Sequence, residues 1–386
     1  MTEAGNEDVQ GGVRGAGDGV HGQVAPGWEP VRDELAAFVA GERHSPEAQL
    51  VLHHKGLRVV DLWTGEDTGP DTLGTVYSIT KGAAHLVVAL LVQEGRIDLD
   101  RPVSAYWPEF AGHGLERLTV RELLAHRSGL IGVEGGFTYE ELTDDAALAA
   151  RVVRAEPYWE PGTKYGYHAM TIGALTGELV RRVTGRTVAE EYDERLRIPY
   201  GLDFFIGLPE ELEERWAPIL PMLPTNEQLA ARAALGGPGE LQLVAFNWNT
   251  EPRLDLVDFA NDRRVRAGGP ASSGGVGTAR GIAGMYAAAL ELLEPETAAE
   301  CARLTTPGAD AVVPQQDAFG LGFERQPAVG DRAFGHSGAA GANAFADPAT
   351  GLAYAYTRRR FAFPGGAAPE NDRFARVAVE VAGRLG

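Results

Sequence analysis

A single apolar helix constrains this chain more than any other segment of its sequence. Residues 80–94 contain nine alanine, valine and leucine side chains, and the run ends at Gly95. These side chains fall on nearly every side of the helix, whereas a surface helix keeps one polar face. We therefore predict that residues 80–94 form a buried helix at the centre of the fold.

Both ends of the chain carry the patterns of a sheet covered by helices. Apolar residues at helical spacing indicate a helix near each end, and short apolar runs around turn residues indicate strand pairs. These segments are 28–41 and 371–385 for the helices, and 49–53 with 57–63 and 344–346 with 352–356 for the strand pairs. The long stretch between the strand pairs shows mostly helical patterns and few strand signals.

This order of elements predicts an α+β architecture in which the two ends of the chain share one sheet. The α/β domain is expected to comprise residues 26–80 and 281–386. The inserted residues 81–280 are expected to form a mostly helical domain with pocket-shaping loops. Residues 1–25 are polar and rich in glycine, which is typical of a disordered leader.

Charge and cysteine content exclude several classes of protein. The 386 residues include 35 basic and 54 acidic side chains, a net charge of −19, whereas nucleic acids and anionic membranes attract basic surfaces. Cys301 is the only cysteine, which excludes an internal disulfide and a cysteine-based metal site. We find no apolar run of membrane-spanning length and no signal-peptide pattern. We expect a cytoplasmic protein that binds neither nucleic acid nor membrane.

Lysine is rare in this sequence, and one lysine follows a serine at helical spacing. The chain has only Lys55, Lys81 and Lys164, so 35 − 3 = 32 of its basic residues are arginine. Ser78 and Lys81 stand three residues apart at the start of the predicted helix, so their side chains share one face. A buried lysine can act as a base near neutral pH, whereas arginine cannot. The pair indicates a nucleophilic serine beside a base.

Two further segments carry candidate functional residues. Tyr167 follows the Pro161-Gly162 turn, and a phenol held beside an ammonium group can serve as a base. Tyr165 is expected to be its structural neighbour. His336 and Gly338 precede the C-terminal strand pair, where a glycine lets a substrate approach the backbone closely.

Together these three segments resemble the serine β-lactamase and penicillin-binding-protein superfamily, above all its class C branch and the family VIII carboxylesterases. The family pattern is S-x-x-K, then Y-x-N, then K-T-G or H-x-G. Ser78 and Lys81 match the first motif, Tyr167 matches the second, and His336 with Gly338 matches the third. Two further family segments are similar to residues 123–130 (LLAHRSGL) and 272–279 (SSGGVGTA). The resemblance covers about residues 25–386.

The resemblance implies an antiparallel sheet flanked by helices, a mostly helical second domain and an active site between them. It also implies acyl transfer that needs no metal and no cofactor. Ser78 would be the nucleophile, and Lys81 and Tyr167 would share the acid–base work. The backbone N–H groups of Ser78 and Ala339 would form the oxyanion hole.

Substrate contacts are expected from three residues. His336 would orient the substrate or support Tyr167, and Gly338 would lie beside the substrate. Trp248 belongs to the segment 217–269, which also contains Met222 and Phe246 and is expected to shape the pocket.

Two departures from the family pattern point to an esterase. Ala169 stands where the family has the asparagine of Y-x-N. His336 replaces the lysine of K-T-G, which in the family is the cation that binds a β-lactam carboxylate. We therefore predict a serine hydrolase that cleaves a small carboxylic ester or amide through an acyl-enzyme. An acyltransferase of secondary metabolism is the alternative, and a true β-lactamase or a non-catalytic binding protein is a weaker one.

Other basic residues are expected to be structural. The arginine run 358–360 is expected to be a solvated strand end, with recognition of a substrate carboxylate as the alternative. His126 is expected to tie down its own loop.

Overall fold

The strands from both ends of the chain form one antiparallel sheet. The computed structural model describes residues 17–234, 236–313 and 318–385, and its main sheet has seven strands in the order β1-β3-β2-β10-β9-β8-β7. These strands are β1 (Val20–Val24), β2 (Ala48–His54), β3 (Leu57–Thr64), β7 (Glu324–Arg325), β8 (Phe334–Ser337), β9 (Asn343–Asp347) and β10 (Leu352–Arg358). The N-terminal and C-terminal strand pairs meet where β2 pairs with β10.

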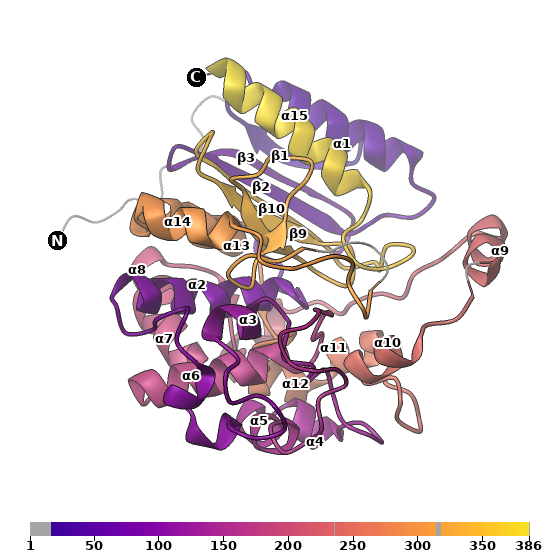
Figure 1. The fold of residues 1–386 in the computed structure, drawn as a ribbon. Helices are drawn as coiled ribbons and strands as arrows, with labels where there is room; N and C mark the ends of the chain where they lie inside the picture. The colour runs from indigo at the N-terminus through magenta and orange to yellow at the C-terminus, as the bar shows by residue number, and fades with distance from the viewer. Residues whose placement is uncertain (1–16, 235, 314–317, 386) are drawn as a thin grey trace.

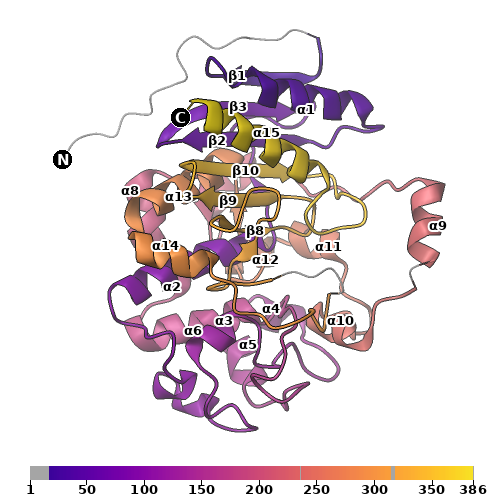
Figure 2. The same ribbon diagram turned by 45° about the horizontal axis from the view of Figure 1, so that its top comes forward.

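Helices cover both faces of this sheet (Figures 1 and 2). On one face, α1 (Glu29–Gly41) and α15 (Glu370–Leu385) lie side by side, and on the other face α13 (Ala279–Leu292) packs against β2, β9 and β10. Successive side chains of a strand point to opposite faces of the sheet, so each strand packs against the helices on both faces. Leu50 of β2 belongs to the apolar cluster under α1 and α15, whereas its neighbour Val51 belongs to the cluster around α2.

Helix α2 (Ile79–Gln93) runs through the middle of the larger apolar core. Every residue from Ile79 to Leu91 is buried, including the polar ones. The helix packs between β8 and α14 on the sheet side and α6 and α7 on the helical side. The prediction of a buried central helix is therefore confirmed.

The remaining α-helices belong to the segment between β3 and β7, most of which lies below the sheet in Figure 1, whereas α9 and α14 lie at the height of the sheet. They are α3 (Val120–Leu124), α4 (Tyr139–Leu142), α5 (Asp145–Val152), α6 (Ile172–Thr184), α7 (Val188–Tyr192), α8 (Ile198–Tyr200), α9 (Asn226–Ala234), α10 (Glu240–Ala245), α11 (Leu256–Asn261), α12 (Arg263–Gly268) and α14 (Pro295–Ala302). A small second sheet has the order β4 (Gly74–Thr75), β6 (Val276–Gly277) and β5 (Phe204–Phe205). It ties the chain just before Ser78 to this helical segment.

Strand β1 differs from the disordered leader predicted for residues 1–25. It pairs with β3 at the edge of the sheet, and Val20 and Val24 are only 2% and 1% exposed. The prediction was wrong for residues 20–24 because a glycine between two valines gives no local strand pattern, so the partner strand and not the segment itself decides its structure. Residues 1–16 lie outside the described residues.

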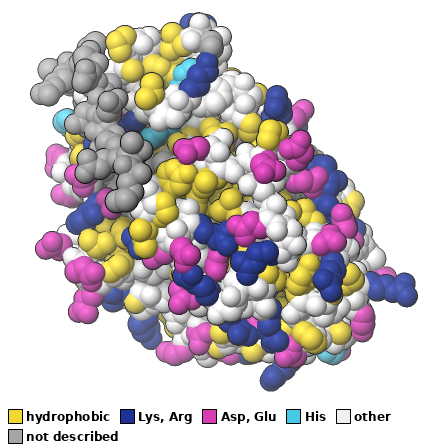
Figure 3. Space-filling model, turned by 90° about the vertical axis from the view of Figure 1, so that its left-hand side faces the viewer, with side chains coloured by type: hydrophobic (Ala, Val, Ile, Leu, Met, Phe, Trp, Pro, Cys, Tyr) yellow, Lys and Arg dark blue, Asp and Glu magenta, His cyan; other side chains and the backbone are white. Residues whose placement is uncertain are grey.

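The described residues were compared with three kinds of binding site: a membrane span, a charged surface patch and a metal site. None of the helices in the described ranges is both long and apolar enough to cross a membrane. On the face shown in Figure 3, Lys and Arg side chains are interspersed with Asp and Glu side chains. In the part of the chain that the structure describes, no group of three or more His, Cys, Asp or Glu side chains could hold a metal ion.

Candidate active site

Ser78 stands at the start of α2, directly after a strained residue. Tyr77 has a φ of 49°, a left-handed conformation that is unfavourable for a bulky side chain. Its ring packs edge-on against Phe361, and its hydroxyl donates to the carbonyl of Leu256 at 2.8 Å. These contacts hold the turn that presents the Ser78 hydroxyl at the N-terminus of α2. No motif in the sequence pointed to Tyr77.

Lys81 contacts Ser78 and is held in place by two backbone carbonyls. Its Nζ donates to Ser78 Oγ at 2.9 Å, to the Ala169 carbonyl at 2.8 Å and to the Ser272 carbonyl at 2.7 Å. An ammonium group has three donors, so each of them has an acceptor. Although Ala169 lacks the amide of the family asparagine, its backbone still binds the lysine.

The burial of Lys81 changes its acid–base behaviour. The side chain is fully buried, and the loss of hydration lowers the pKa of its ammonium group from 10.5 to about 7. The nearby carboxyl groups of Glu324 and Asp145 raise this pKa, because negative charge favours the ammonium form. At neutral pH a large share of Lys81 is therefore a neutral amine that can accept a proton.

Tyr167 reaches the same serine oxygen from another element. Its hydroxyl donates to Ser78 Oγ at 2.8 Å, and Lys81 Nζ lies 5.0 Å from the centre of its ring. Tyr165 points elsewhere, since its hydroxyl donates to the Gly308 carbonyl at 3.3 Å. Lys81 and Tyr167 thus converge on one hydroxyl group, and Tyr165 does not.

The segment 123–130 fixes the loop that carries Tyr167. His126 Nδ1 accepts a hydrogen bond from the His168 backbone N–H at 3.1 Å, and the ring of His168 shares a hydrogen bond with Ser128 Oγ at 2.7 Å. Burial lowers the pKa of His168 to about 4 and holds the pKa of His126 well below its usual range, so both rings are neutral. Through these hydrogen bonds to His168, the segment fixes the backbone next to Tyr167.

The end of β8 comes close to the chain that carries Ser78. A Cβ atom on Gly338 would lie 2.5 Å from the carbonyl oxygen of Val76, so only glycine fits there. The next residue, Ala339, has a backbone N–H with no acceptor among the described residues, and the same holds for the Ser78 N–H. Two unpaired amides are what an oxyanion hole requires, and this role stays a prediction.

His336 is fully buried beside Tyr167, with their ring centres 6.1 Å apart. Its Nδ1 lies 3.2 Å from Glu324 Oε1 and 2.9 Å from the Ser337 carbonyl, while Glu324 Oε2 accepts from the Ser337 N–H at 2.7 Å. Burial lowers the pKa of His336 to about 3, so the ring is neutral. Both roles expected for His336, orienting the substrate and supporting Tyr167, stay predictions. Glu324 was missed in the sequence, where it belongs to no motif.

The segment 217–269 contributes to the surroundings of Ser78 at two places. Trp248 is half-buried and stacks on Phe246, whose ring centre lies 6.1 Å from that of Tyr167. Met222 packs against the small apolar cluster that contains Tyr77.

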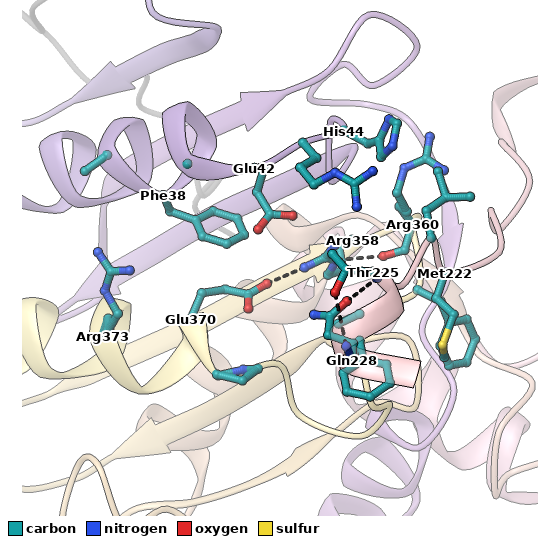
Figure 4. Close-up of a pocket in the computed structure, with 18 residues that line it drawn as sticks. Phe38, Glu42, His44, Met222, Thr225, Gln228, Arg358, Arg360, Glu370 and Arg373 are labelled. Atoms are coloured by element: carbon teal, nitrogen blue, oxygen red, sulfur yellow. Dashed lines mark hydrogen bonds and ion pairs between the residues drawn. The ribbon is translucent and has the colours of Figure 1, made fainter. Parts of the chain in front are cut away.

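A cavity of about 530 Å³ lies elsewhere, where β10 ends between α1 and α15 (Figure 4). Arg358 in its wall pairs with Glu370 at 2.5 Å, and Arg359 pairs with Glu47 at 3.1 Å. The prediction of a solvated strand end at 358–360 was wrong for Arg358 and Arg359, which are both buried. Carboxylates from α15 and from the chain before β2 balance their charges, and these partners are distant in the sequence.

Comparisons with known proteins agree with the motifs. The family model described as Beta-lactamase matches residues 28–378. The esterase/beta-lactamase LipL of Mycobacterium tuberculosis is 31% identical over an alignment of 390 positions, gaps included. The alignment covers 90% of this chain and 85% of LipL. The structure of EstA from Arthrobacter nitroguajacolicus is similar with a TM-score of 0.85 and 37% identity, covering 94% of this chain and 98% of EstA. A family VIII carboxylesterase structure gives a TM-score of 0.83 and 32% identity, covering 94% of this chain and 99% of the carboxylesterase. The resemblance and the fold class inferred from the sequence are both confirmed, and the chain belongs to the beta-lactamase family.

Proposed function

We propose that this protein is a serine carboxylesterase that works through an acyl-enzyme on Ser78. One observation carries the proposal: Ser78 Oγ lies 2.9 Å from the Nζ of a fully buried lysine and 2.8 Å from the hydroxyl of Tyr167. A serine activated in this way is a nucleophile for acyl transfer. The similarity to LipL and to a family VIII carboxylesterase supports esters as the substrate class.

Acylation would begin with the transfer of the Ser78 proton to neutral Lys81. Ser78 Oγ attacks the carbonyl carbon of the ester, and the carbonyl oxygen becomes an oxyanion that accepts hydrogen bonds from the Ser78 and Ala339 N–H groups. The bond between the carbonyl carbon and the alcohol oxygen then breaks. Tyr167 gives its proton to the departing oxygen and regains one from the Lys81 ammonium group.

Deacylation would use the same groups in reverse. A water molecule attacks the carbonyl carbon of the acyl-enzyme, and its proton passes through the Tyr167 hydroxyl to Lys81. The bond to Ser78 Oγ breaks, Ser78 regains its proton, and the carboxylic acid leaves. An added alcohol in place of water would turn the same step into acyl transfer.

Short p-nitrophenyl esters are expected to be hydrolysed with a higher kcat/KM than penicillins or cephalosporins. The groups that bind a β-lactam in the family are altered here, because Ala169 has no side-chain amide and His336 is neutral and buried. Steady-state rates with each substrate give the kcat/KM values, and intact-mass spectrometry shows which esters, amides and lactams form an acyl-enzyme, since each adds the mass of its acyl group. Product analysis with an added alcohol measures transfer, because transfer releases a new ester in place of the carboxylic acid. A cephalosporin with the higher kcat/KM would replace the esterase assignment with that of a β-lactamase.

Tyr167→Phe is expected to lower kcat by about 10²- to 10⁴-fold, as the loss of a general acid–base group does. Tyr165→Phe removes the same hydroxyl two residues away, where it donates to the Gly308 carbonyl and not to Ser78, and is expected to cost far less. Steady-state rates with one ester compare the two variants. If Tyr165→Phe were the impaired variant, Tyr167 would not be the acid–base group.

A further inference from the structure

An unusual backbone turn lies between Phe246 and Trp248. Asn247 has a φ of 56°, in the left-handed region that asparagine adopts more readily than other residues with a side chain. Its buried side chain accepts from the Phe137 N–H at 2.7 Å and donates to the Phe137 carbonyl at 3.0 Å. These two hydrogen bonds fix the backbone between Phe246 and Trp248 in one conformation, and they thereby set the positions of both aromatic side chains.

The chain around this turn is packed tightly onto a facing loop. Asn249 donates to a backbone carbonyl of that loop at 2.9 Å. A Cβ atom on Gly136 would lie 2.4 Å from the Thr250 side chain, and one on Gly132 would lie 2.7 Å from the Val244 side chain. Both glycines are therefore needed for the close packing, and the segment is held rigidly.

The turn builds an aromatic wall, which we define as Phe246 and Trp248. Their rings stack with centres 4.8 Å apart and planes 24° apart. Phe246 contacts the ring of Tyr167, and the guanidinium group of Arg253 lies 4.8 Å from the Trp248 ring. Both members of the wall are only partly buried. A partly open, rigid aromatic surface next to Tyr167, whose hydroxyl donates to Ser78 Oγ, is suited to bind an apolar group.

We infer that the aromatic wall binds the alcohol portion of the ester, so that esters of aromatic or other bulky apolar alcohols are the preferred substrates. The inference rests on the proposed function. The departing alcohol oxygen must lie within hydrogen-bond distance of the Tyr167 hydroxyl, which protonates it. The rest of the alcohol then lies next to the Tyr167 ring, and the wall begins there. The carbonyl oxygen would be held instead by the Ala339 amide, which lies just after the end of β8.

Acetate esters of two alcohols test this inference. Benzyl alcohol and ethanol have similar acidity, so benzyl acetate and ethyl acetate differ mainly in the size of the leaving group. We expect wild-type protein to have a higher kcat/KM for benzyl acetate, and Trp248→Ala to lower this preference by about tenfold, the upper range for an aromatic contact. Phe246→Leu is expected to act in the same direction. Trp63→Ala is the matched control, because Trp63 is a half-buried tryptophan stacked on His21 in a distant strand.

The rate of deacylation distinguishes binding of the alcohol by Trp248 from a purely structural role of Trp248. Both acetates give the same acetyl-enzyme, and the alcohol has left before the acetyl-enzyme is hydrolysed. In Trp248→Ala, hydrolysis of the acetyl-enzyme is therefore expected to keep its wild-type rate, measured by intact mass over time. Slower deacylation, or an equal loss of kcat/KM for both acetates, would overturn the inference.

A second series of esters varies the acid with ethanol fixed. If Trp248→Ala changed the preference between ethyl acetate and ethyl phenylacetate and not that between the two acetates, the wall would bind the acyl portion and the inference would be wrong. If wild-type protein formed no acyl-enzyme with any ester, the proposed function itself would fail. The two failures are therefore distinguishable.

Discussion

Ser78→Ala is expected to lower kcat for ester hydrolysis by about 10⁴-fold or more, because it removes the atom that forms the acyl bond. The fold is expected to survive. The Ser78 side chain does not cap α2, and the loss of one hydroxyl leaves no large cavity. Steady-state rates with p-nitrophenyl acetate measure the first effect, and the thermal unfolding midpoint measures the second.

Ser104→Ala provides the matched control for this variant. Ser104 is also partly buried and also makes a hydrogen bond, to the Glu116 carbonyl at 3.1 Å, but it lies in a peripheral 3₁₀ turn. Its loss is expected to leave kcat unchanged. Turnover by Ser78→Ala within about tenfold of the wild-type rate would show that another group is the nucleophile.

Lys81→Arg is expected to lower kcat by about 10³-fold, nearly as much as Lys81→Ala, although the positive charge is kept. A guanidinium group does not lose its proton near neutral pH, and it is larger than the fully enclosed space that the ammonium group occupies. Lys164→Arg is the control, because Lys164 is exposed and is expected to tolerate the change. An active Lys81→Arg enzyme would mean that Lys81 supplies only positive charge and that Tyr167 alone acts as the base.

The pH dependence of the wild-type enzyme tests the same assignment. Only the neutral amine can accept the Ser78 proton, and burial lowers the pKa of Lys81 to about 7. The kcat/KM is therefore expected to fall as the pH drops below about 7, where the amine gains a proton, and to level off above it. A kcat/KM that stays constant from pH 8 to pH 5 would contradict this role of Lys81.

Local patterns predicted the elements that bury many of their own apolar residues. Helix α2 and the pair β2–β3 were readable because their side chains repeat at helical or strand spacing over a whole element. Strand β1 was missed because only two valines carry it. The buried pairs of Arg358 and Arg359 were also missed, since their partners Glu370 and Glu47 are distant in the sequence.

The residues of the candidate site also fall into two groups, those that the sequence predicted and those that it did not. Ser78, Lys81 and Tyr167 could be named because family motifs mark them. Tyr77 and Asn247 could not, because a left-handed backbone angle leaves no signal in residue types that also occur in ordinary loops.

The pairing of β2 with β10 has a consequence for how the protein is made. Residues 48–54 leave the ribosome about 300 residues before their partners at 352–358, which at 5–20 residues per second corresponds to roughly 15–60 s. During that time one edge of the apolar strand β2 and the apolar side of α2 that later meets β8 have no partner from the chain. Unpaired strand edges and exposed apolar surface promote aggregation. We therefore expect the nascent chain to depend on chaperones until its last strands emerge.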